Sequence, residues 1–466
     1  MKKLHSTLRL LLTNLRQERR APFLFLPQRL DVKALCIAVY YEVAKHAHRD
    51  MHIIGLVLKE LTAQGILNKD PVLYYSYDLD TITMHDVFLT TSDNRIFSRG
   101  TSTDMSEAYA KALGEVFERT GIRYNADTRT EVGSEKDLQK KGMVVVGVGM
   151  FPQPTEVQKQ TFKDASVTRD DSFSWVPSTN SNDGMTWYIP AQTVFLNIVE
   201  GRDHEQSIIS PSSHGAGAGY SKEQAIASGV HEILNRHFFL ESWYMKIVPE
   251  RIDTTTIPNN SKAHILIRNL EQRGFTINLL NYSDKAGIPS VICILERCGG
   301  WFCGGSAGTS LETVIERAVT EAFSIYSWCI RKTIAGENIY NANSMKLLQN
   351  GFIDTEFGDA KSRLLLYGYS YCIKNHIQFT SFITGKNIPF STQWDTDDTY
   401  DCQKHAHDLL GDVFVYEIQK EYIQRYEYHV VKVVIPSSYF FSLEESGSRP
   451  VRMGTYPQNT QINPFP

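Results

Sequence analysis

The chain has 466 residues, 42% of them hydrophobic and 21% charged, with a formal net charge of −4, which is the composition of an ordinary globular protein with room for two or three domains. The slightly acidic balance argues against a general nucleic-acid binder, which needs a basic excess, and no run of 18 apolar residues is present that could span a membrane. The seven cysteines include no CxxC pair, so we expect reduced thiols in a cytoplasmic protein.

The first 80 residues differ in pattern from the rest of the chain. Apolar residues at helical spacing predict helices in 30–50 and 51–70, and Gly65 ends the second helix. The following run, "PVLYYSYDLDTITM", is typical of short strands. A helix, a glycine stop and short strands resemble a winged helix, and the segment has no strong basic excess. We therefore predict a winged-helix-like domain over 1–80 that docks a protein or peptide, followed by a larger domain over 81–466.

The larger domain alternates β-rich runs with long helical patterns. The runs are "GMVVVGVGMF", "WYIPAQTVFLNIV" and "IPSVICILE". This alternation predicts an α+β fold. The polar, turn-rich stretch 152–184 is expected to be a surface loop.

Three segments of the larger domain repeat one design. They are "RGTSTDMSEAYAKALGEVFERTG", "HGAGAGYSKEQAIASGVHEILNRHFF" and "GGSAGTSLETVIERAVTEAFSIYS". Each begins with glycine and small hydroxyl residues, continues into a helix-capping pattern and places a glutamate about three turns into the helix. The capping pairs are Asp104 with Glu107, Ser221 with Gln224 and Thr309 with Glu312, and the glutamates are Glu115, Glu232 and Glu321. Packing alone hardly explains three capped helices that each carry an internal carboxylate.

Charged and amide side chains share a helix face with each glutamate, because residues three and four apart are neighbours. They are Lys111, Glu118 and Arg119 beside Glu115, Asn235 and Arg236 beside Glu232, and Arg317 beside Glu321. Salt bridges on a solvated face are the simpler interpretation of any single pair. The flanking residues are apolar, however, and converging carboxylates then need a cation. Together with arginines and glycine-rich helix starts, the set suits Mg2+ and a polyphosphate, and the lack of a GxxxxGK[ST] motif argues against a P-loop.

The three segments resemble the nucleotide-binding motifs of the YcaO family. "KALGEVFER" is similar to the first motif, "HGAGAG…HEILNR" to the second and "RAVTEAF" to the third. "WYIPAQTVFL" and "RHFFLESWYMKIVPERID" resemble further segments, closest to the azoline-forming cyclodehydratase D proteins. The resemblance covers about residues 85–466. It implies a YcaO-type α+β domain with mixed and antiparallel sheets.

This resemblance also implies a reaction, the ATP-dependent cyclodehydration of Cys, Ser or Thr residues in a ribosomally made precursor peptide. The side chain attacks the preceding backbone carbonyl, the oxyanion is phosphorylated, and loss of phosphate leaves a thiazoline or oxazoline. ATP and Mg2+ would be the cofactors. The partners would be the precursor peptide, a ThiF-like protein with a peptide-recognition winged helix and, where azolines are oxidised to azoles, an FMN-dependent dehydrogenase.

Site roles follow from the resemblance position by position. Those expected to hold Mg2+ are Glu115, Glu232 and Glu321. Those expected to contact phosphates are Arg119, Arg236 and Arg317, and the nucleotide site is completed by Arg99, Lys111, Glu118 and Asn235. The chain departs from the family pattern at Lys111, Tyr220, Gln224, Asn235 and Ser324. Two of these changes replace glutamates by amides, which bind Mg2+ more weakly. A YcaO protein of another branch, such as a thioamide-forming one, and a degenerate scaffold or substrate-binding subunit are therefore alternatives.

The sequence ends in "QINPFP". A frayed end is the ordinary expectation for such a tail. Azoline-forming members commonly end in a proline-rich tail, however, and "NPFP" resembles a shortened version of it. The resemblance implies that Pro464 and Pro466, together with Arg317, are catalytic, with the terminal carboxylate near the phosphate end of the nucleotide site.

Overall fold

The computed structural model describes residues 49–92, 97–125, 128–151, 167–196, 205–206, 208–209, 212–297, 299–334, 382–397 and 399–439. The first described helix, α3 (Arg49–Ala63), stops before Gly65, whose φ of 71° lies in the left-handed region that ends helices, as predicted. The chain divides into two compact units, residues 1–55 and residues 56–466. Most of the proposed docking domain over 1–80 lies outside the described residues, so that domain stays a prediction.

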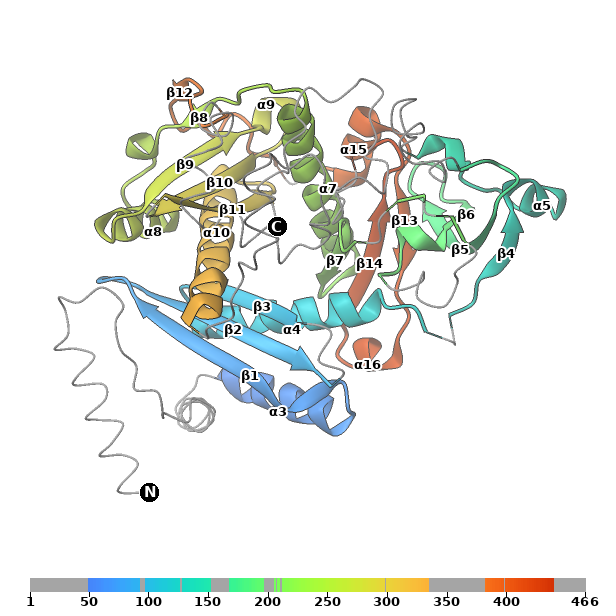
Figure 1. The fold of residues 1–466 in the computed structure, drawn as a ribbon, viewed down its shortest axis with the longest axis horizontal. Helices are drawn as coiled ribbons and strands as arrows, with labels where there is room; N and C mark the ends of the chain where they lie inside the picture. The colour runs from blue at the N-terminus through green and yellow to red at the C-terminus, as the bar shows by residue number, and fades with distance from the viewer. Residues whose placement is uncertain are drawn as a thin grey trace, which may run out of the picture. The chain divides into compact units, whose positions relative to one another are not determined.

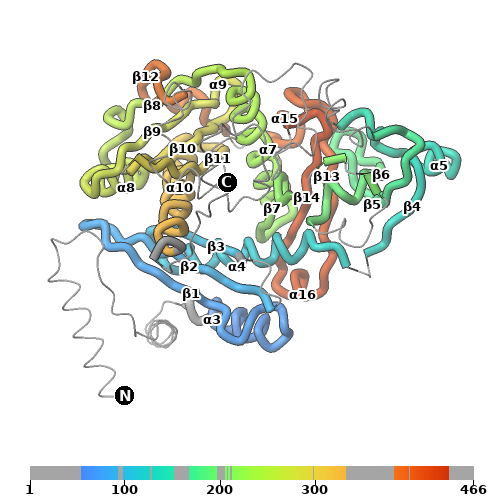
Figure 2. The backbone as a smooth tube through the Cα atoms, viewed as in Figure 1, coloured from blue at the N-terminus to red at the C-terminus, as the bar shows by residue number. Residues whose placement is uncertain are grey.

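Three sheets organise the larger unit (Figures 1 and 2). The first, in the order β1-β2-β3, contains β1 (Leu67–Asp78), β2 (Thr83–Thr91) and β3 (Phe97–Ser102). The second, in the order β11-β10-β9-β8-β12, contains β8 (Arg251–Ile252), β9 (Thr276–Asn281), β10 (Ser290–Arg297), β11 (Gly300–Ala307) and β12 (Asn387–Ile388). The third, in the order β4-β5-β13-β14-β7 with β6 paired to β5, contains β4 (Glu131–Ser134), β5 (Ser172–Asn180), β6 (Thr186–Pro190), β7 (Ala216–Gly219), β13 (Phe414–Glu417) and β14 (His429–Val434).

The strand pairs confirm the predicted fold class. The first and third sheets are antiparallel, and the second is mixed because β12 runs parallel to β8. The first sheet contains strands from both sides of the predicted domain boundary at residue 80, because β1 pairs with β2. The shorter helices are α5 (Glu135–Lys140), η1 (Val148–Met150), η2 (Ala191–Thr193), η3 (Thr254–Thr256), α8 (Lys262–Gln272), α9 (Ser283–Ala286), α15 (Cys402–Leu410) and α16 (Glu421–Gln424). Within the described part of the chain, every helix is too short or too polar to cross a lipid bilayer.

The repeated segments form three long helices. They are α4 (Met105–Gly121), α7 (Lys222–Tyr244) and α10 (Leu311–Ile334), and they follow β3, β7 and β11, which belong to three different sheets. Each helix packs against the strand before it, and we call each such pair a strand–helix unit. Each helix also contacts the strand of another strand–helix unit: α4 contacts β7, α7 contacts β11 and α10 contacts β3. These contacts close a ring, and Figure 1 shows the three helices around one central region.

Two of the three predicted helix caps are confirmed. The Asp104 side chain accepts a hydrogen bond from the Glu107 N–H at 2.9 Å, and Ser221 does the same for Gln224 at 3.2 Å. The expected cap at Thr309 is wrong, because α10 begins at Leu311 and the N–H of Leu311 donates to the Asp395 carboxylate at 2.7 Å. A residue 84 positions further along the chain thus satisfies this helix end, which a local pattern cannot reveal.

Glycines let each repeated helix lie directly on its strand. A methyl group on Gly100 would lie 1.9 Å from the carbonyl oxygen of Ala108, and one on Gly217 would lie 2.0 Å from that of Ala225. Both distances are far below van der Waals contact, so these positions admit no side chain. The close approach brings the side chains three turns into each helix within reach of the strand backbone.

The second sheet is buried on both faces. Ile292 and Ile294 of β10 belong to the core beneath α7, whereas Val291, Cys293 and Leu295 belong to the core beneath α8 and α10. This two-sided burial explains why the predicted strand "IPSVICILE" is continuously apolar rather than alternating.

Two sequence expectations for the third sheet were wrong. Part of the stretch 152–184, expected to be a surface loop, forms β5, because Phe173 and Trp175 are fully buried although polar residues surround them in the sequence. The run "GMVVVGVGMF", expected to be a strand, makes a single bridge from Val145 to Tyr188 and then the short helix η1. In both segments the secondary structure depends on packing against distant parts of the chain, which the local sequence does not show.

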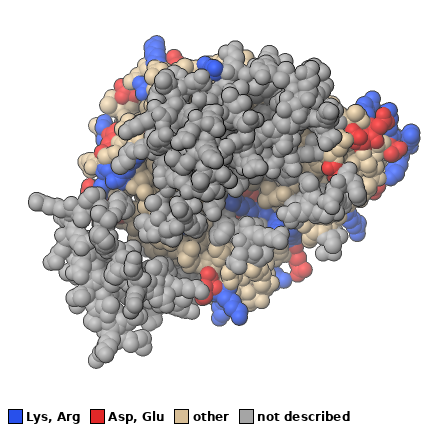
Figure 3. Space-filling view, in the orientation of Figure 1, with Lys and Arg blue, Asp and Glu red and all other residues tan. Residues whose placement is uncertain are grey.

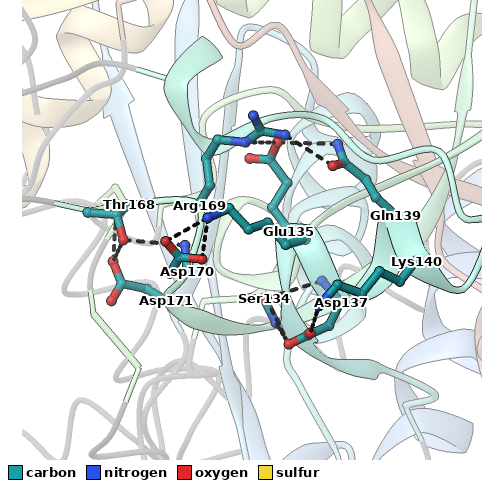
Figure 4. Close-up of polar contacts among 10 residues, drawn as sticks. Ser134, Glu135, Asp137, Gln139, Lys140, Thr168, Arg169, Asp170 and Asp171 are labelled. Atoms are coloured by element: carbon teal, nitrogen blue, oxygen red, sulfur yellow. Dashed lines mark hydrogen bonds and ion pairs between the residues drawn. The ribbon is translucent and has the colours of Figure 1, made fainter.

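Polar contacts connect α5 to the neighbouring segment 168–171 (Figure 4). Ser134 and Asp137 form a reciprocal capping box at the start of this helix. The buried Glu135 carboxylate accepts hydrogen bonds from Arg169 at 2.7 Å and from the N–H of Val148 at 3.2 Å. This one carboxylate therefore joins α5, η1 and the segment leading into β5.

Candidate functional site

A cavity of about 780 Å³ lies where the three strand–helix units meet. Eight of the ten residues predicted to bind a nucleotide line it: Arg99, Lys111, Glu115, Glu232, Asn235, Arg236, Arg317 and Glu321. The other two, Glu118 and Arg119, lie on α4 next to it, and Arg119 contacts Glu115. In the space-filling view of Figure 3, which has the orientation of Figure 1, a group of Lys and Arg side chains is visible near the centre of the molecule. The proposed catalytic residues Pro464 and Pro466 lie outside the described residues.

Each of the three repeated glutamates is held by the backbone of a strand segment. Its carboxylate accepts a hydrogen bond from a main-chain N–H at or next to the strand that precedes the helix. The donors are Arg99 for Glu115, Gly215 for Glu232 and Gly305 for Glu321, the last two at 2.9 and 2.7 Å. The same contact in all three units fixes the carboxylates toward one cavity before any ligand is present.

The arginines of the three units are used differently. Arg119 pairs with Glu115 at 2.6 Å, and Arg236 pairs with Glu232 at 2.9 Å. Arg317 precedes its glutamate by one turn instead of following it, is exposed at the cavity, and makes no ion pair within the described part of the chain. It is therefore the arginine best placed to meet an anionic ligand.

Burial, and to a lesser degree neighbouring carboxylates, disfavours the charged form of two glutamates at the site. Burial raises the pKa of Glu321, with Arg236 and the Gly305 N–H opposing this shift. Burial together with the charges of Glu232 and Glu115 raises the pKa of Glu118 well above its usual value. A bound cation would relieve this repulsion, which favours a metal ion in the cavity.

The metal would need ligands beyond the protein. Among the described residues, no group of three His, Cys, Asp or Glu side chains converges closely enough to hold a metal ion. Mg2+ commonly takes one or two protein carboxylates and completes its shell with phosphate oxygens and water. The oxygen donors of this cavity fit that chemistry.

Asn235 is oriented by the strands it touches. Its amide nitrogen lies 3.2 Å from the carbonyl oxygen of Val291, 3.0 Å from that of Ser306 and 3.0 Å from the Ser290 hydroxyl. Carbonyl oxygens only accept hydrogen bonds, so the amide NH2 must face the strands and only the amide oxygen is available to a ligand. This explains why an amide, which can donate to the strands, occupies this position instead of the glutamate that the sequence resemblance led us to expect.

Lys111 lines the cavity and also contacts the first turn of α4. Its ammonium pairs with Glu107 at 2.8 Å and donates to the Thr101 carbonyl oxygen at 3.3 Å. Its charge is therefore shared with the first turn of α4 as well as with the cavity that it lines.

Two residues of the site lie outside the quoted motifs, and a third, His231, begins the motif segment "HEILNR" but was given no role from the sequence. His231 and Tyr428 line the cavity, and Lys432 lies fully buried beside it. The Lys432 ammonium donates to the Ser212 carbonyl oxygen at 2.6 Å; burial lowers its pKa to about 8, although the charges of Glu232 and Glu118 oppose this. Tyr428 and Lys432 reach the site because β14 pairs with β7 across more than 200 residues, and no local signal records that pairing.

Comparison with known proteins places this geometry in context. The family model described as YcaO cyclodehydratase, ATP- and Mg2+-binding, matches residues 99–438. A segment of 253 residues is 25% identical to an uncharacterized protein of Haemophilus influenzae and covers 48% of this chain but 40% of that protein. The chain thus spans less than half of that relative.

Several solved structures share the fold. One is a heterocyclase in complex with substrate and cofactor, with a TM-score of 0.62 and 14% identity over 85% of this chain and 53% of that chain. Another is the E. coli microcin synthetase McbBCD complex with pro-MccB17 bound, with a TM-score of 0.57 and 14% identity over 85% and 96%. A third is YcaO from Methanopyrus kandleri bound with AMPPCP and Mg2+, with a TM-score of 0.54 and 15% identity over 87% and 96%.

Proposed function

The chain belongs to the YcaO family, whose model carries the description ATP- and Mg2+-binding, and from that membership we propose that it is an ATP-dependent, azoline-forming cyclodehydratase. Its substrate is a ribosomally made precursor peptide in which Cys, Ser or Thr residues become thiazolines or oxazolines. The cavity between α4, α7 and α10 is the nucleotide site.

One observation carries this proposal. Three glutamates from three helices are turned toward a single cavity by the same strand-to-carboxylate hydrogen bond. Oriented carboxylates suit Mg2+ and the phosphates of ATP, as does Arg317, which makes no ion pair among the described residues. A structural role for the glutamates would not require all three to line the same cavity.

The proposed roles follow from charge. Glu115, Glu232 and Glu321, aided by the Asn235 oxygen, would hold one or two Mg2+ ions, with one or two protein carboxylates for each ion and phosphate oxygens and water as the other ligands. The bound metal would neutralise phosphate charge. Arg317 and Arg236 contact the phosphates. The protein's main contribution is then to position the reactants. The side-chain thiol or hydroxyl loses its proton and bonds to the preceding carbonyl carbon, and the carbonyl oxygen takes the γ-phosphoryl group as ADP is released. Phosphate then leaves with that oxygen while the amide nitrogen loses its proton and the ring C=N forms.

We also propose protein partners. The similar microcin synthetase is a complex with pro-MccB17 bound, and the similar heterocyclase holds a substrate. By analogy, this chain would act with a ThiF-like protein that recognises the precursor, through a docking domain over residues 1–80.

The test is a reconstituted reaction with the co-purified partner and its precursor peptide. Mass spectrometry should show the loss of one water per ring, dependent on ATP and Mg2+, and an 18O label on the substrate amide should appear in the released phosphate. Exchange of oxygen for sulfur would identify the thioamide branch instead. Unmodified peptide together with no nucleotide hydrolysis would indicate the degenerate scaffold.

A further inference from the structure

A fully buried carboxylate, Asp86 on β2, lies behind the wall of the cavity. The Thr101 hydroxyl lies 2.8 Å from one of its oxygens, and the Ser327 hydroxyl contacts the other. The Thr101 hydroxyl also lies 2.9 Å from the hydroxyl of Ser324. Both Thr101 and Ser324 line the cavity, so two hydrogen bonds connect the buried carboxylate to the ligand space.

The direction of these hydrogen bonds is fixed by proton count. An ionised carboxylate can only accept, so the single hydroxyl hydrogen of Thr101 must point to Asp86. The Thr101 oxygen can then serve Ser324 only as an acceptor, and the Ser324 hydrogen is used on Thr101. Ser324 consequently presents only lone pairs to the cavity.

A second chain of hydrogen bonds, through Ser327 and Tyr77, also points its hydrogens toward Asp86. The Ser327 hydroxyl donates to Asp86, and the Tyr77 hydroxyl lies 2.6 Å from Ser327, so Tyr77 is the donor in that pair. Both oxygens of the Asp86 carboxylate are therefore occupied by donors. Such a satisfied network has one low-energy arrangement of its hydrogens.

A nearby cation faces the carboxylate. The Arg99 guanidinium donates to the carbonyl oxygen of Ser324 at 3.0 Å and interacts electrostatically with Asp86. Burial lowers the pKa of Arg99, and the charge of Asp86 is the largest effect opposing that shift. The two charges support each other behind the site.

We propose that Asp86 is a positioning residue for the nucleotide, acting through Thr101 to hold Ser324 as an obligatory hydrogen-bond acceptor in the cavity. This inference rests on the proposed nucleotide site and deepens it. Phosphate oxygens carry no hydrogen at neutral pH, so the partner of Ser324 is a donor of the Mg2+–ATP complex, either a water on the metal or an O–H or N–H group of the nucleotide.

The test is a double-mutant cycle on ATP affinity, measured by calorimetry on the purified full chain. Asp86→Asn keeps the shape but adds an NH2 donor, which frees the Thr101 or Ser327 hydrogen and removes the fixed polarity. Asp86→Asn and Ser324→Ala should each weaken ATP binding, by roughly fivefold. The double variant should bind no more than about twofold more weakly than Ser324→Ala, because the effect of Asp86 passes through Ser324. Asp137→Asn, which removes a carboxylate at α5, should leave the affinity unchanged.

Independent losses that multiply in the double variant would overturn the inference, since Asp86 would then act by another route. If Asp86→Asn does not fold, as judged by its thermal transition, Thr101→Val takes its place in the same cycle. Coupling seen only with Mg2+ assigns the donor to water on the metal, and coupling seen also in EDTA assigns it to the nucleotide. A wild-type chain that binds no ATP with Mg2+ present refutes the proposed function itself, which separates the two failures.

Discussion

The carboxylate of Glu321 accepts a hydrogen bond from the backbone N–H of Gly305 at 2.7 Å, which ties the third turn of α10 to β11. The same contact joins Glu232 to Gly215 at 2.9 Å. A side chain that is already held by the main chain loses little rotamer freedom when a ligand arrives. These contacts therefore make each glutamate a preorganised ligand rather than a surface charge.

Replacing Glu232 or Glu321 by glutamine should separate orientation from charge. The amide oxygen of glutamine can still accept the strand N–H, so folding should persist, whereas the ligand charge is lost. We expect each variant to lose about tenfold or more in affinity for ATP in the presence of Mg2+. Calorimetry with Glu312→Gln, in the first turn of α10, is the matched control. Wild-type affinity in both site variants would refute the metal assignment.

Arg317→Gln should weaken nucleotide binding without destabilising the fold. The side chain is exposed and makes no ion pair with any described residue, so its removal leaves no buried partner unsatisfied. The expected loss is about tenfold in ATP affinity, with the thermal midpoint unchanged. Arg236→Gln, which breaks the 2.9 Å contact to Glu232, should by contrast change both quantities. Equal ATP affinity for wild type and Arg317→Gln would remove Arg317 from the phosphate site.

Local patterns predicted much of this site because its design is local. The capping residues Asp104 and Ser221 and the glutamates of the three helices follow one another within single segments. Helical spacing and capping chemistry act over a few residues, and one chain therefore records them.

Other parts could not be predicted because distant segments create them. Lys432 lies beside the cavity because β14 pairs with β7, and Asp86 is linked to Ser324 through Thr101 on a neighbouring strand. The strand β5 was missed because the burial of Trp175 depends on packing that its polar neighbours conceal. The register of a sheet is a long-range property, and a single sequence does not state it.

Asn235→Asp should destabilise the fold strongly. It replaces an NH2 group that faces two carbonyl oxygens with a carboxylate that cannot donate to them. We expect a loss of about 3 kcal/mol, larger at pH 8 than at pH 5 because protonation restores one donor. Urea unfolding at both pH values measures this. Asn235→Ala, which leaves the carbonyls unpaired without adding charge, should show no such pH difference, and a pH-independent loss in the aspartate variant would contradict the assigned amide orientation.

Gly217→Ala tests the close contact between β7 and α7. The added methyl group would lie 2.0 Å from the Ala225 carbonyl oxygen, so strand and helix would have to separate. The cost should be about 3 kcal/mol or more, together with a loss of ATP affinity as Glu232 moves away from its backbone donor. Gly149→Ala is the matched control because no atom lies within 4 Å of the added methyl group. Comparable stability of the two variants would show that the strand–helix distance is not fixed as described.

Lys432 should give stability a recognisable dependence on pH. Burial lowers its pKa from 10.5 to about 8 in the folded protein. Between these values the unfolded chain binds a proton at this lysine and the folded chain does not, so the lysine's contribution to stability increases as pH rises from about 8 to about 10.5. Below pH 8 both states are protonated, and the full cost of burying the charge applies.

The comparison is therefore between wild type and Lys432→Met by urea unfolding at about pH 7 and pH 10. The methionine variant should have a higher free energy of unfolding than wild type at pH 7, and this difference should shrink at pH 10. Glu118, whose pKa is raised by burial and by neighbouring carboxylates, titrates in the same network. Repeating the pair of measurements in a Glu118→Gln background removes that group, and the sign of the lysine effect should persist. A difference between lysine and methionine that stays constant from pH 7 to pH 10 in this background would mean that the Lys432 ammonium keeps an ordinary pKa despite its burial.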